Sequence, residues 1–171
     1  VIGLNKVAII TPIPDMVDVI IQQSMLRKAH TEGIIDFDVV DLRNFGQGNY
    51  RQIDDTPYGG GGGMVLMAEP LFAALDHAIA NIGASTNLRI IYPSPQGLQW
   101  SQDAAQENSS LENLIFICGH YKDIDHRVID KYVTHEYSIG DYVVTSGEIP
   151  TMIMIDSIVR LLPGVLNNFD S

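Results

Sequence analysis

Short apolar segments alternate with amphipathic segments along most of this chain of 171 residues. The apolar segments are rich in β-branched residues and have the length of strands, whereas the amphipathic segments have helical spacing. We predict strands at Lys6–Thr11, Phe37–Leu42, Leu88–Tyr92, Asn113–Cys118 and Glu136–Ile139. We predict helices at Asp15–His30, Glu69–Ile82, Gln99–Asn108, Ile124–Tyr132 and Pro150–Leu162. Strands separated by helices are typical of a mainly parallel sheet with helices on both faces, so the sequence predicts a single α/β domain.

The net charge and the cysteine content of the chain limit which partners and which cellular location we expect. The chain carries 10 Lys and Arg against 21 Asp and Glu, for a net charge of −11. Affinity for nucleic acid rests on Lys and Arg that neutralise phosphates, so a nucleic acid partner requires local basic residues or a second domain. The single cysteine, Cys118, cannot form an internal disulfide, and no apolar stretch has the length of a membrane span. We therefore expect a soluble, cytoplasmic protein with no membrane association.

The loops that follow the predicted strands are the places to look for a ligand site, because parallel sheets bind ligands beyond the carboxyl ends of their strands. The first such loop, Arg43–Gly63, has no periodicity and contains Asp54 and Asp55 followed by five consecutive glycines. A flexible linker and a loop that brings its backbone close to a ligand both fit this pattern. The apolar Met64–Met67 that follows favours the ligand. Neither a Walker nor a Rossmann glycine pattern is present.

The other three loops mix glycine, aromatic and polar residues. Tyr92–Gly97 contains two prolines and a glycine, which fits a ring-binding turn or a plain connection between elements. Cys118–Arg127 contains two histidines without regular ligand spacing, so we expect no metal and keep open a solvated helix start capped by Asp125. Ser138–Pro150 has glycines whose backbone amides could bind an adenine or ribose edge. The chain has no Gly-x-Ser-x-Gly elbow, which argues against a hydrolase of that type.

Near the end of the last predicted helix, Asp156 and Arg160 are spaced to lie on one face. They fit an exposed ion pair, and Arg160 alternatively fits a cation directed at a polarised base carbonyl.

Taken together, these segments resemble the bacterial tRNA (guanine-N1)-methyltransferase family of the knotted SPOUT class. The resemblance rests on motifs that follow one another in the order of the family: Lys6–Thr11, Arg51–Asp55, Pro57–Gly61, Tyr92–Gly97, Cys118–Val128, Ser138–Pro150 and Arg160–Leu166. The chain departs from the family pattern at several loop positions, namely Gly62 for proline, His120 for arginine, Lys122 for glutamate, Asp123 for glycine and Ser146 for glycine.

The resemblance implies a deep trefoil knot within the α/β fold. It also implies a SPOUT methyltransferase domain over residues 1–166, with residues 167–171 starting a linker to a C-terminal tRNA-binding domain that is absent here. Members of the family are homodimers with the active site between subunits. Ile153, Ile155 and Ile158 of the last helix could be buried in such a dimer or in the core of one subunit. Without the C-terminal domain, we expect weak or no turnover and loose tRNA binding.

The cofactor implied by the resemblance is S-adenosylmethionine, held in the knot by residues of the second, third and fourth loops. The implied cofactor-binding residues are Tyr92, Pro93, Ser94, Pro95, Gly119, Tyr121, Ser138, Ile139, Gly140, Asp141, Tyr142, Val143, Val144, Ser146, Gly147 and Pro150. The implied substrate-binding residues are Tyr58, Gly59, Gly60, Gly61, His120 and Lys122. No metal is implied.

The implied reaction is methyl transfer to N1 of guanine 37, next to the anticodon of tRNA. N1 of guanine must lose a proton while negative charge develops on O6, so a base and a cation are required. By family likeness Arg160 is the cation, and Asp54 and Asp55 surround the flipped base. The family's proton acceptor is an aspartate that follows the knotted domain, and Asp170 is not assigned to that role. The alternative function is a non-catalytic scaffold that binds S-adenosylmethionine and dimerises, which the departures at His120, Lys122 and Ser146 favour.

Overall fold

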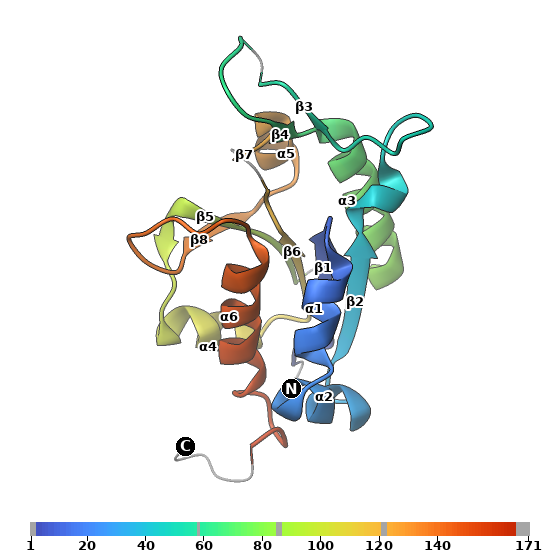
Figure 1. Ribbon diagram of the computed structural model, residues 1–171. Helices are drawn as coiled ribbons and strands as arrows, with labels where there is room; N and C mark the ends of the chain where they lie inside the picture. Colours follow the sequence, from blue (N-terminus) through green and yellow to red (C-terminus); the bar gives the residue numbers. More distant parts are fainter. Residues whose placement is uncertain (1–2, 58, 85–86, 121–122, 167–171) are drawn as a thin grey trace.

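The computed structural model describes residues 3–57, 59–84, 87–120 and 123–166 (Figure 1). Its largest element is a five-stranded sheet with the strand order β2-β1-β6-β5-β8, in which all neighbours are parallel. The strands are β1 (Lys6–Thr11), β2 (Asp36–Asp41), β5 (Leu88–Gln99), β6 (Asn113–Ile117) and β8 (His135–Ser138). The predicted α/β class with a mainly parallel sheet is therefore confirmed.

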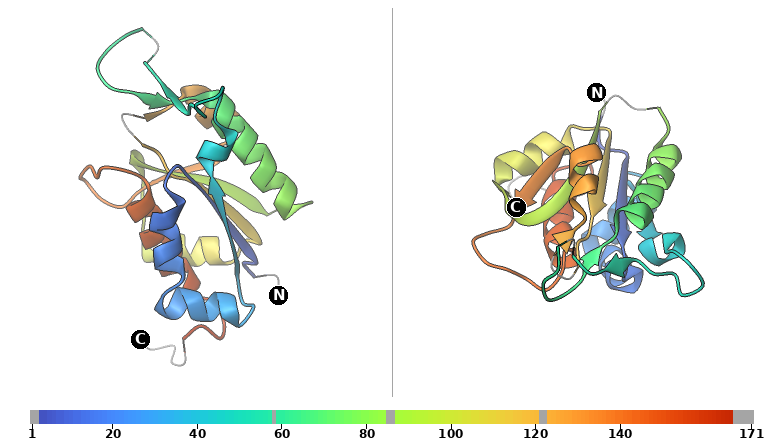
Figure 2. Two further views of the ribbon diagram at one scale, coloured as in Figure 1. Left: turned by 45° about the vertical axis from the view of Figure 1, so that its right-hand side comes forward. Right: turned by 90° about the horizontal axis from the view of Figure 1, so that it is seen from above.

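Helices cover both faces of this sheet, as Figure 2 shows. One face carries α1 (Pro14–Ile21), α2 (Ser24–Thr31), α4 (Gln102–Ser109) and α6 (Glu148–Val159), and the other carries α3 (Ala68–Ile82) and α5 (His126–Lys131). Successive side chains of a strand point to opposite faces, which gives the sheet two cores. In β1, Val7 and Ile9 pack with α1 and α6, whereas Ala8 and Ile10 pack with α3.

The long glycine-containing loop is more ordered than the sequence predicted. Leu42–Phe45 forms a short 3₁₀ helix, η1, and Gln47 and Gln52 form an isolated bridge. A second, three-stranded sheet with the order β3-β4-β7 lies beyond the carboxyl ends of the main strands (Figure 1). Its strands are β3 (Asp54–Asp55), β4 (Val65–Leu66) and β7 (Asp123–Ile124). The prediction of a wholly irregular Arg43–Gly63 segment missed β3, because its partner β4 begins only after this segment and is paired in turn with the distant β7.

The single helix predicted at Asp15–His30 is two helices, α1 and α2. Ile21 and Leu26 are both buried, yet five residues on one continuous helix would place their side chains about 140° apart. The break, with Ser24 at φ 48°, lets both face the core. Asp15 is not the N-cap, because the helix begins at Pro14, whose missing N–H suits the first position of a helix.

The predicted turn at Pro93–Gly97 lies inside β5, because the strand leaves the sheet and rejoins it. Pro93 and Leu98 both pair with Tyr137 of β8, so the residues between them bulge out. As a result β5 extends to Gln99, and α4 begins only at Gln102, after the N-cap Ser101, whose hydroxyl accepts a hydrogen bond from Ala104 N at 3.2 Å.

The loop after β8 returns from the edge of the sheet to its middle. Gly147 N, just before α6, donates a hydrogen bond of 2.8 Å to Gly119 O, just after β6. The segments that follow β5, β6 and β8 therefore meet at one place. The trefoil knot implied by the resemblance stays a prediction.

Candidate functional site

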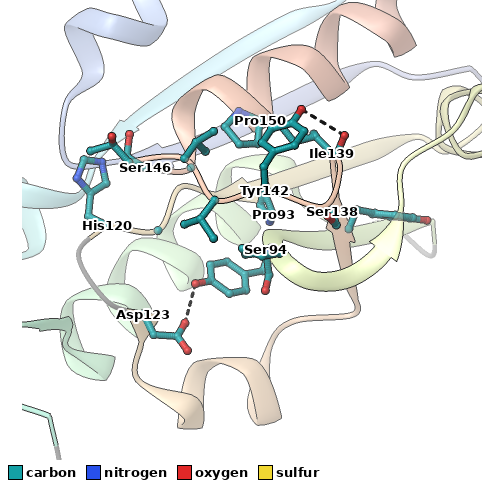
Figure 3. A pocket seen from close by; sticks show the side chains of 17 residues that line it. Pro93, Ser94, His120, Asp123, Ser138, Ile139, Tyr142, Ser146 and Pro150 are labelled. Atoms are coloured by element: carbon teal, nitrogen blue, oxygen red, sulfur yellow. Dashed lines mark hydrogen bonds between the residues drawn. The ribbon is translucent and has the colours of Figure 1, made fainter. Parts of the chain in front are cut away.

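A pocket lies where these three segments meet (Figure 3). It is formed by the bulge of β5, the start of the segment after β6, the loop after β8 and the first turn of α6. The residues that line it are Tyr92, Pro93, Ser94, Pro95, Gly119, His120, Asp123, Tyr137, Ser138, Ile139, Tyr142, Val143, Val144, Thr145, Ser146, Gly147 and Pro150. The sequence argument that ligands bind beyond the carboxyl ends of parallel strands thus leads to a pocket in the folded chain.

The back of the pocket depends on a close approach of two backbone segments. A Cβ atom added to Gly147 would lie 2.7 Å from Gly119 N and 3.0 Å from the Cα atom of Cys118. Only glycine fits there, because the obstructing atoms belong to the backbone and cannot rotate away. Any side chain at position 147 would push the loop away from β6 and change the shape of the pocket.

The outer wall is a loop of exposed apolar residues. The side chain of Val143 is 82% exposed and that of Tyr142 55% exposed. The hydroxyl of Tyr142 donates to Ile139 O at 3.5 Å (Figure 3), and the Ser138 hydroxyl donates to Gly140 O at 2.9 Å. Apolar groups this exposed are expected to be covered by a ligand or by another chain.

The inner wall carries a tyrosine bonded to a carboxylate. The Tyr92 hydroxyl donates to Asp123 Oδ1 at 2.7 Å, drawn as a dashed line in Figure 3. Burial raises the pKa of Tyr92 far above its ordinary value, and the hydrogen bond to Asp123 raises it further. Tyr92 therefore stays neutral and remains a donor to Asp123 throughout the physiological pH range.

On another side of the pocket, His120 is held by a buried carboxylate. His120 Nε2 contacts Glu148 Oε1, and the Glu148 side chain has no solvent exposure. The second oxygen, Oε2, has no hydrogen-bond partner among the described residues. The buried Cys118 thiol is close enough to Glu148 to be affected by its charge. Burial raises the pKa of this thiol well above its usual range, and the charge of Glu148 raises that pKa further. His120 is thus a pocket residue whose orientation depends on Glu148, and its predicted contact with the substrate base stays a prediction.

The chemistry of the wall indicates the kind of ligand it suits. Within the described chain, no Lys or Arg lines the pocket, and Asp123 is the one lining residue that is an acid. Such a wall offers none of the Arg and Lys side chains that commonly bind phosphate groups. It suits an uncharged ring packed against Pro, Tyr and Val, with a positive charge elsewhere in the ligand.

Most of the predicted cofactor-binding residues line this pocket. Gly140 and Asp141 belong to the same loop but are not lining residues, and Tyr121 lies outside the described residues. Sequence reasoning missed Asp123, Tyr137 and Thr145 as pocket residues. Tyr137 and Thr145 are direct sequence neighbours of predicted residues, which was an available signal. Asp123 directly follows Lys122, a predicted substrate-binding residue, but its place in the pocket wall depends on the pairing of β7 with β4.

Asp54 and Asp55, which are predicted to surround the flipped base in the catalytic site, lie beside the pocket and do not line it. Asp55 pairs with Val65, and Val65 pairs with Asp123, so three residues lie in register across the small sheet. Adjacent strands are about 4.8 Å apart, which places the Asp55 backbone about 10 Å from that of Asp123. Gly59, Gly60 and Gly61, at the tip of the same hairpin, all have positive φ angles. Of the predicted base-binding residues, Tyr58 and Lys122 lie outside the described residues.

Arg160 lies at the far end of α6 from the pocket. Gly147 and Pro150 line the pocket at the start of the helix, whereas Arg160 is its C-cap. Arg160 follows Glu148 by twelve positions, which correspond to about 18 Å along the helix axis. One chain by itself therefore does not bring Arg160 to the pocket.

Comparisons with known proteins decide the family. The family model described as tRNA (Guanine-1)-methyltransferase TrmD matches residues 5–171. This chain belongs to that family. A curated tRNA (guanine-N(1)-)-methyltransferase of Staphylococcus carnosus is 45% identical over 166 residues, which are 97% of this chain and 66% of that protein. The tRNA (guanine-N(1)-)-methyltransferase of Borreliella burgdorferi is 43% identical over 95% of this chain, and again 66% of its own length is covered.

The fold of this TrmD-family chain also matches a solved structure. The crystal structure of tRNA (m1G37) methyltransferase from Aquifex aeolicus superposes with a TM-score of 0.87 at 33% sequence identity, over 96% of this chain and 73% of that one. The family named from the sequence motifs is thereby confirmed. The chain spans 66% of the length of each of the two curated relatives described above.

Two further findings concern membranes and metals. None of the helices in the described parts of this TrmD-family chain is both long and apolar enough to cross a membrane. Within the same parts, no three or more His, Cys, Asp or Glu side chains gather in a way that could hold a metal ion.

Proposed function

We propose that this chain is the cofactor-binding catalytic domain of an S-adenosylmethionine-dependent methyltransferase that acts on N1 of guanine 37 in tRNA. The observation that carries the proposal is the pocket formed by the segments after β5, β6 and β8, in a chain whose relatives are named as methyltransferases of this type. The names of those relatives favour an enzyme over a non-catalytic scaffold.

The form and charge of the pocket walls support S-adenosylmethionine as the ligand. The lack of a side chain at Gly147 lets the loop after β8 lie directly against Gly119, and this contact forms the back of the pocket. Tyr92, Pro93, Ile139 and Tyr142 would hold the adenine, which needs no basic residues. When bound, this cofactor supplies a methyl group on a positively charged sulfur, which keeps the S–C electron pair when the methyl carbon bonds to the acceptor.

The acceptor side of the reaction requires two groups from the protein. N1 of guanine must lose its proton to a base, and the negative charge that develops on O6 needs a cation. We assign the cation to Arg160 and the surroundings of the extruded base to Asp54, Asp55 and the glycines 59–61. The segment that carries the family's proton acceptor would begin near position 170, and this position lies outside the described residues.

The location of Arg160 leads us to propose a homodimer. Because Arg160 lies about 18 Å along α6 from the pocket, a second copy must bring its own Arg160 to the site. The exposed Ile149 and Ile153 on α6 give a dimer apolar surface to cover, with exposures of 49% and 45%. Ile155 and Ile158 are fully buried within one chain, so the core and not a dimer accounts for them.

We propose that tight tRNA binding belongs to a C-terminal domain joined to this SPOUT domain of residues 1–166 through the segment that starts at residue 167. The net charge of −11 supports this division of labour, because phosphate binding needs basic residues. A tRNA-modifying enzyme of this kind would work in the cytoplasm. For these 171 residues alone we expect S-adenosylmethionine binding with weak or no turnover.

The test joins this chain to the C-terminal domain of the Staphylococcus carnosus relative and measures transfer of a labelled methyl group to tRNA. A transcript with guanine at position 37 should be methylated, and one with adenine there should not. Arg160→Ala in the fusion should abolish transfer while calorimetry still shows cofactor binding. A fusion that binds both S-adenosylmethionine and tRNA but never methylates would refute the enzymatic proposal and favour the scaffold.

A further inference from the structure

The wall of the pocket carries an acidic charge that the family resemblance does not explain. Asp123 lines the pocket beside Tyr92, and within the described residues no Lys or Arg lines it. We propose that Asp123 makes the pocket select by charge, so that it holds the cationic methyl donor more tightly than the neutral product left after transfer. This inference rests on the proposed function, which supplies the donor.

The position of the Asp123 carboxylate is well determined by its neighbours. Its Oδ1 accepts hydrogen bonds from the Tyr92 hydroxyl at 2.7 Å and from Ile124 N at 2.8 Å. Its backbone pairs with Val65 in the small sheet. Two donors thus hold this carboxylate at a fixed place on the wall.

A second acidic residue lies next to Tyr92. Glu136 of β8 pairs with Tyr92 of β5. Burial is the largest cause that raises the pKa of Tyr92, and Asp123 and Glu136 raise it further. A charge in the wall acts on a ligand several ångströms away without direct contact.

Methyl transfer changes the charge of the bound molecule by one unit. The donor carries a positive sulfur, whereas the sulfur of S-adenosylhomocysteine is neutral, and the two molecules otherwise share the same groups. A fixed negative wall therefore attracts the donor and loses this attraction when the methyl group leaves. The consequence is preferential binding of fresh donor and easier release of product.

The size of the effect is limited by solvent, because Asp123 is an exposed residue. Ion pairs at exposed sites contribute modestly, which corresponds to about a two- to fivefold change in affinity. The same exposure makes the effect sensitive to salt, because mobile ions screen charges that solvent can reach.

The experiment is calorimetric titration of the 171-residue chain with S-adenosylmethionine and, separately, with S-adenosylhomocysteine, at low and high salt. Asp123→Asn should weaken donor binding by about two- to fivefold and leave product binding unchanged. High salt should reduce the donor preference of the wild type and have little effect on that of Asp123→Asn. The matched control is Asp130→Asn, which removes a carboxylate from α5 that does not line the pocket.

The possible results separate the two proposals. Equal weakening of both ligands by Asp123→Asn, or no preference for the donor in the wild type, would overturn the charge selection and leave the cofactor proposal standing. Absence of binding of either ligand to a folded wild-type chain, as judged by circular dichroism, would overturn both. A donor preference lost in Asp123→Asn and kept in Asp130→Asn would support the inference.

Discussion

Replacing His120 with alanine tests whether the buried carboxylate of Glu148 depends on its imidazole partner. The Glu148 side chain has no exposure, its Oε1 contacts His120, and its Oε2 has no partner among the described residues. Removing one member of a buried charged pair costs about 3–5 kcal/mol, because the remaining charge stays buried without compensation.

We therefore expect His120→Ala to lower the free energy of unfolding by about 3–5 kcal/mol. In a domain of this size each kcal/mol lowers the melting temperature by about 2–4 °C, so the expected decrease is about 6–20 °C. Differential scanning calorimetry and urea denaturation at pH 7 measure these two quantities. Adding Glu148→Gln to His120→Ala should restore part of the loss, because the double variant buries no charge.

The chain offers a matched control in a second histidine–carboxylate pair. His126 Nε2 lies 3.3 Å from Asp130 Oδ1, and the two side chains are 77% and 69% exposed. Exposed pairs contribute little, so His126→Ala should change the melting temperature by less than about 2 °C. If His120→Ala and His126→Ala lost the same stability, or if Glu148→Gln worsened His120→Ala, the account of a buried dependent charge would be refuted.

Three further predictions concern the pocket, a helix cap and the dimer. Gly147→Val should abolish S-adenosylmethionine binding in calorimetry, because a Cβ atom there would lie 2.7 Å from Gly119 N, and unchanged affinity would contradict this packing. Ser101→Ala should lower the free energy of unfolding in urea by about 0.5–2 kcal/mol through loss of the cap of α4, whereas no loss would show that the cap is dispensable. Ile153→Asp should shift the sedimentation coefficient from dimer to monomer, and a dimer that persists would place the interface elsewhere.

Some elements of the fold follow from local sequence alone. The strand predicted at Lys6–Thr11 has the same bounds in the structure, and Asn113–Cys118 differs from β6 by one residue. Short runs of β-branched and other apolar residues bounded by turn residues favour strands through local preference. The helical periodicity of Asp15–His30 was equally clear, yet it could not reveal the break between α1 and α2, which only packing against the sheet requires.

Some features of the candidate site could likewise be predicted from the sequence, and others could not. That ligand-binding loops follow β5, β6 and β8 could be predicted, because parallel strands bring their carboxyl ends to one edge of the sheet. The sequence could not predict that Asp123 lines the pocket, because its position depends on the pairing of β7 with β4. These two strands are far apart in the sequence. The burial of Glu148 is a similar case, since an acidic residue in the first turn of a helix is ordinarily a solvated one.

The sequence by itself determined the α/β class, the position of the loops and, through its motifs, the family. These properties depend on residues close together in the chain, whose spacing decides which backbone conformation buries their apolar side chains. Only the tertiary structure decided which polar groups share the pocket and which carboxylate is buried beneath His120. Those properties depend on contacts between distant segments, and it is the burial of both faces of the sheet that brings such segments together.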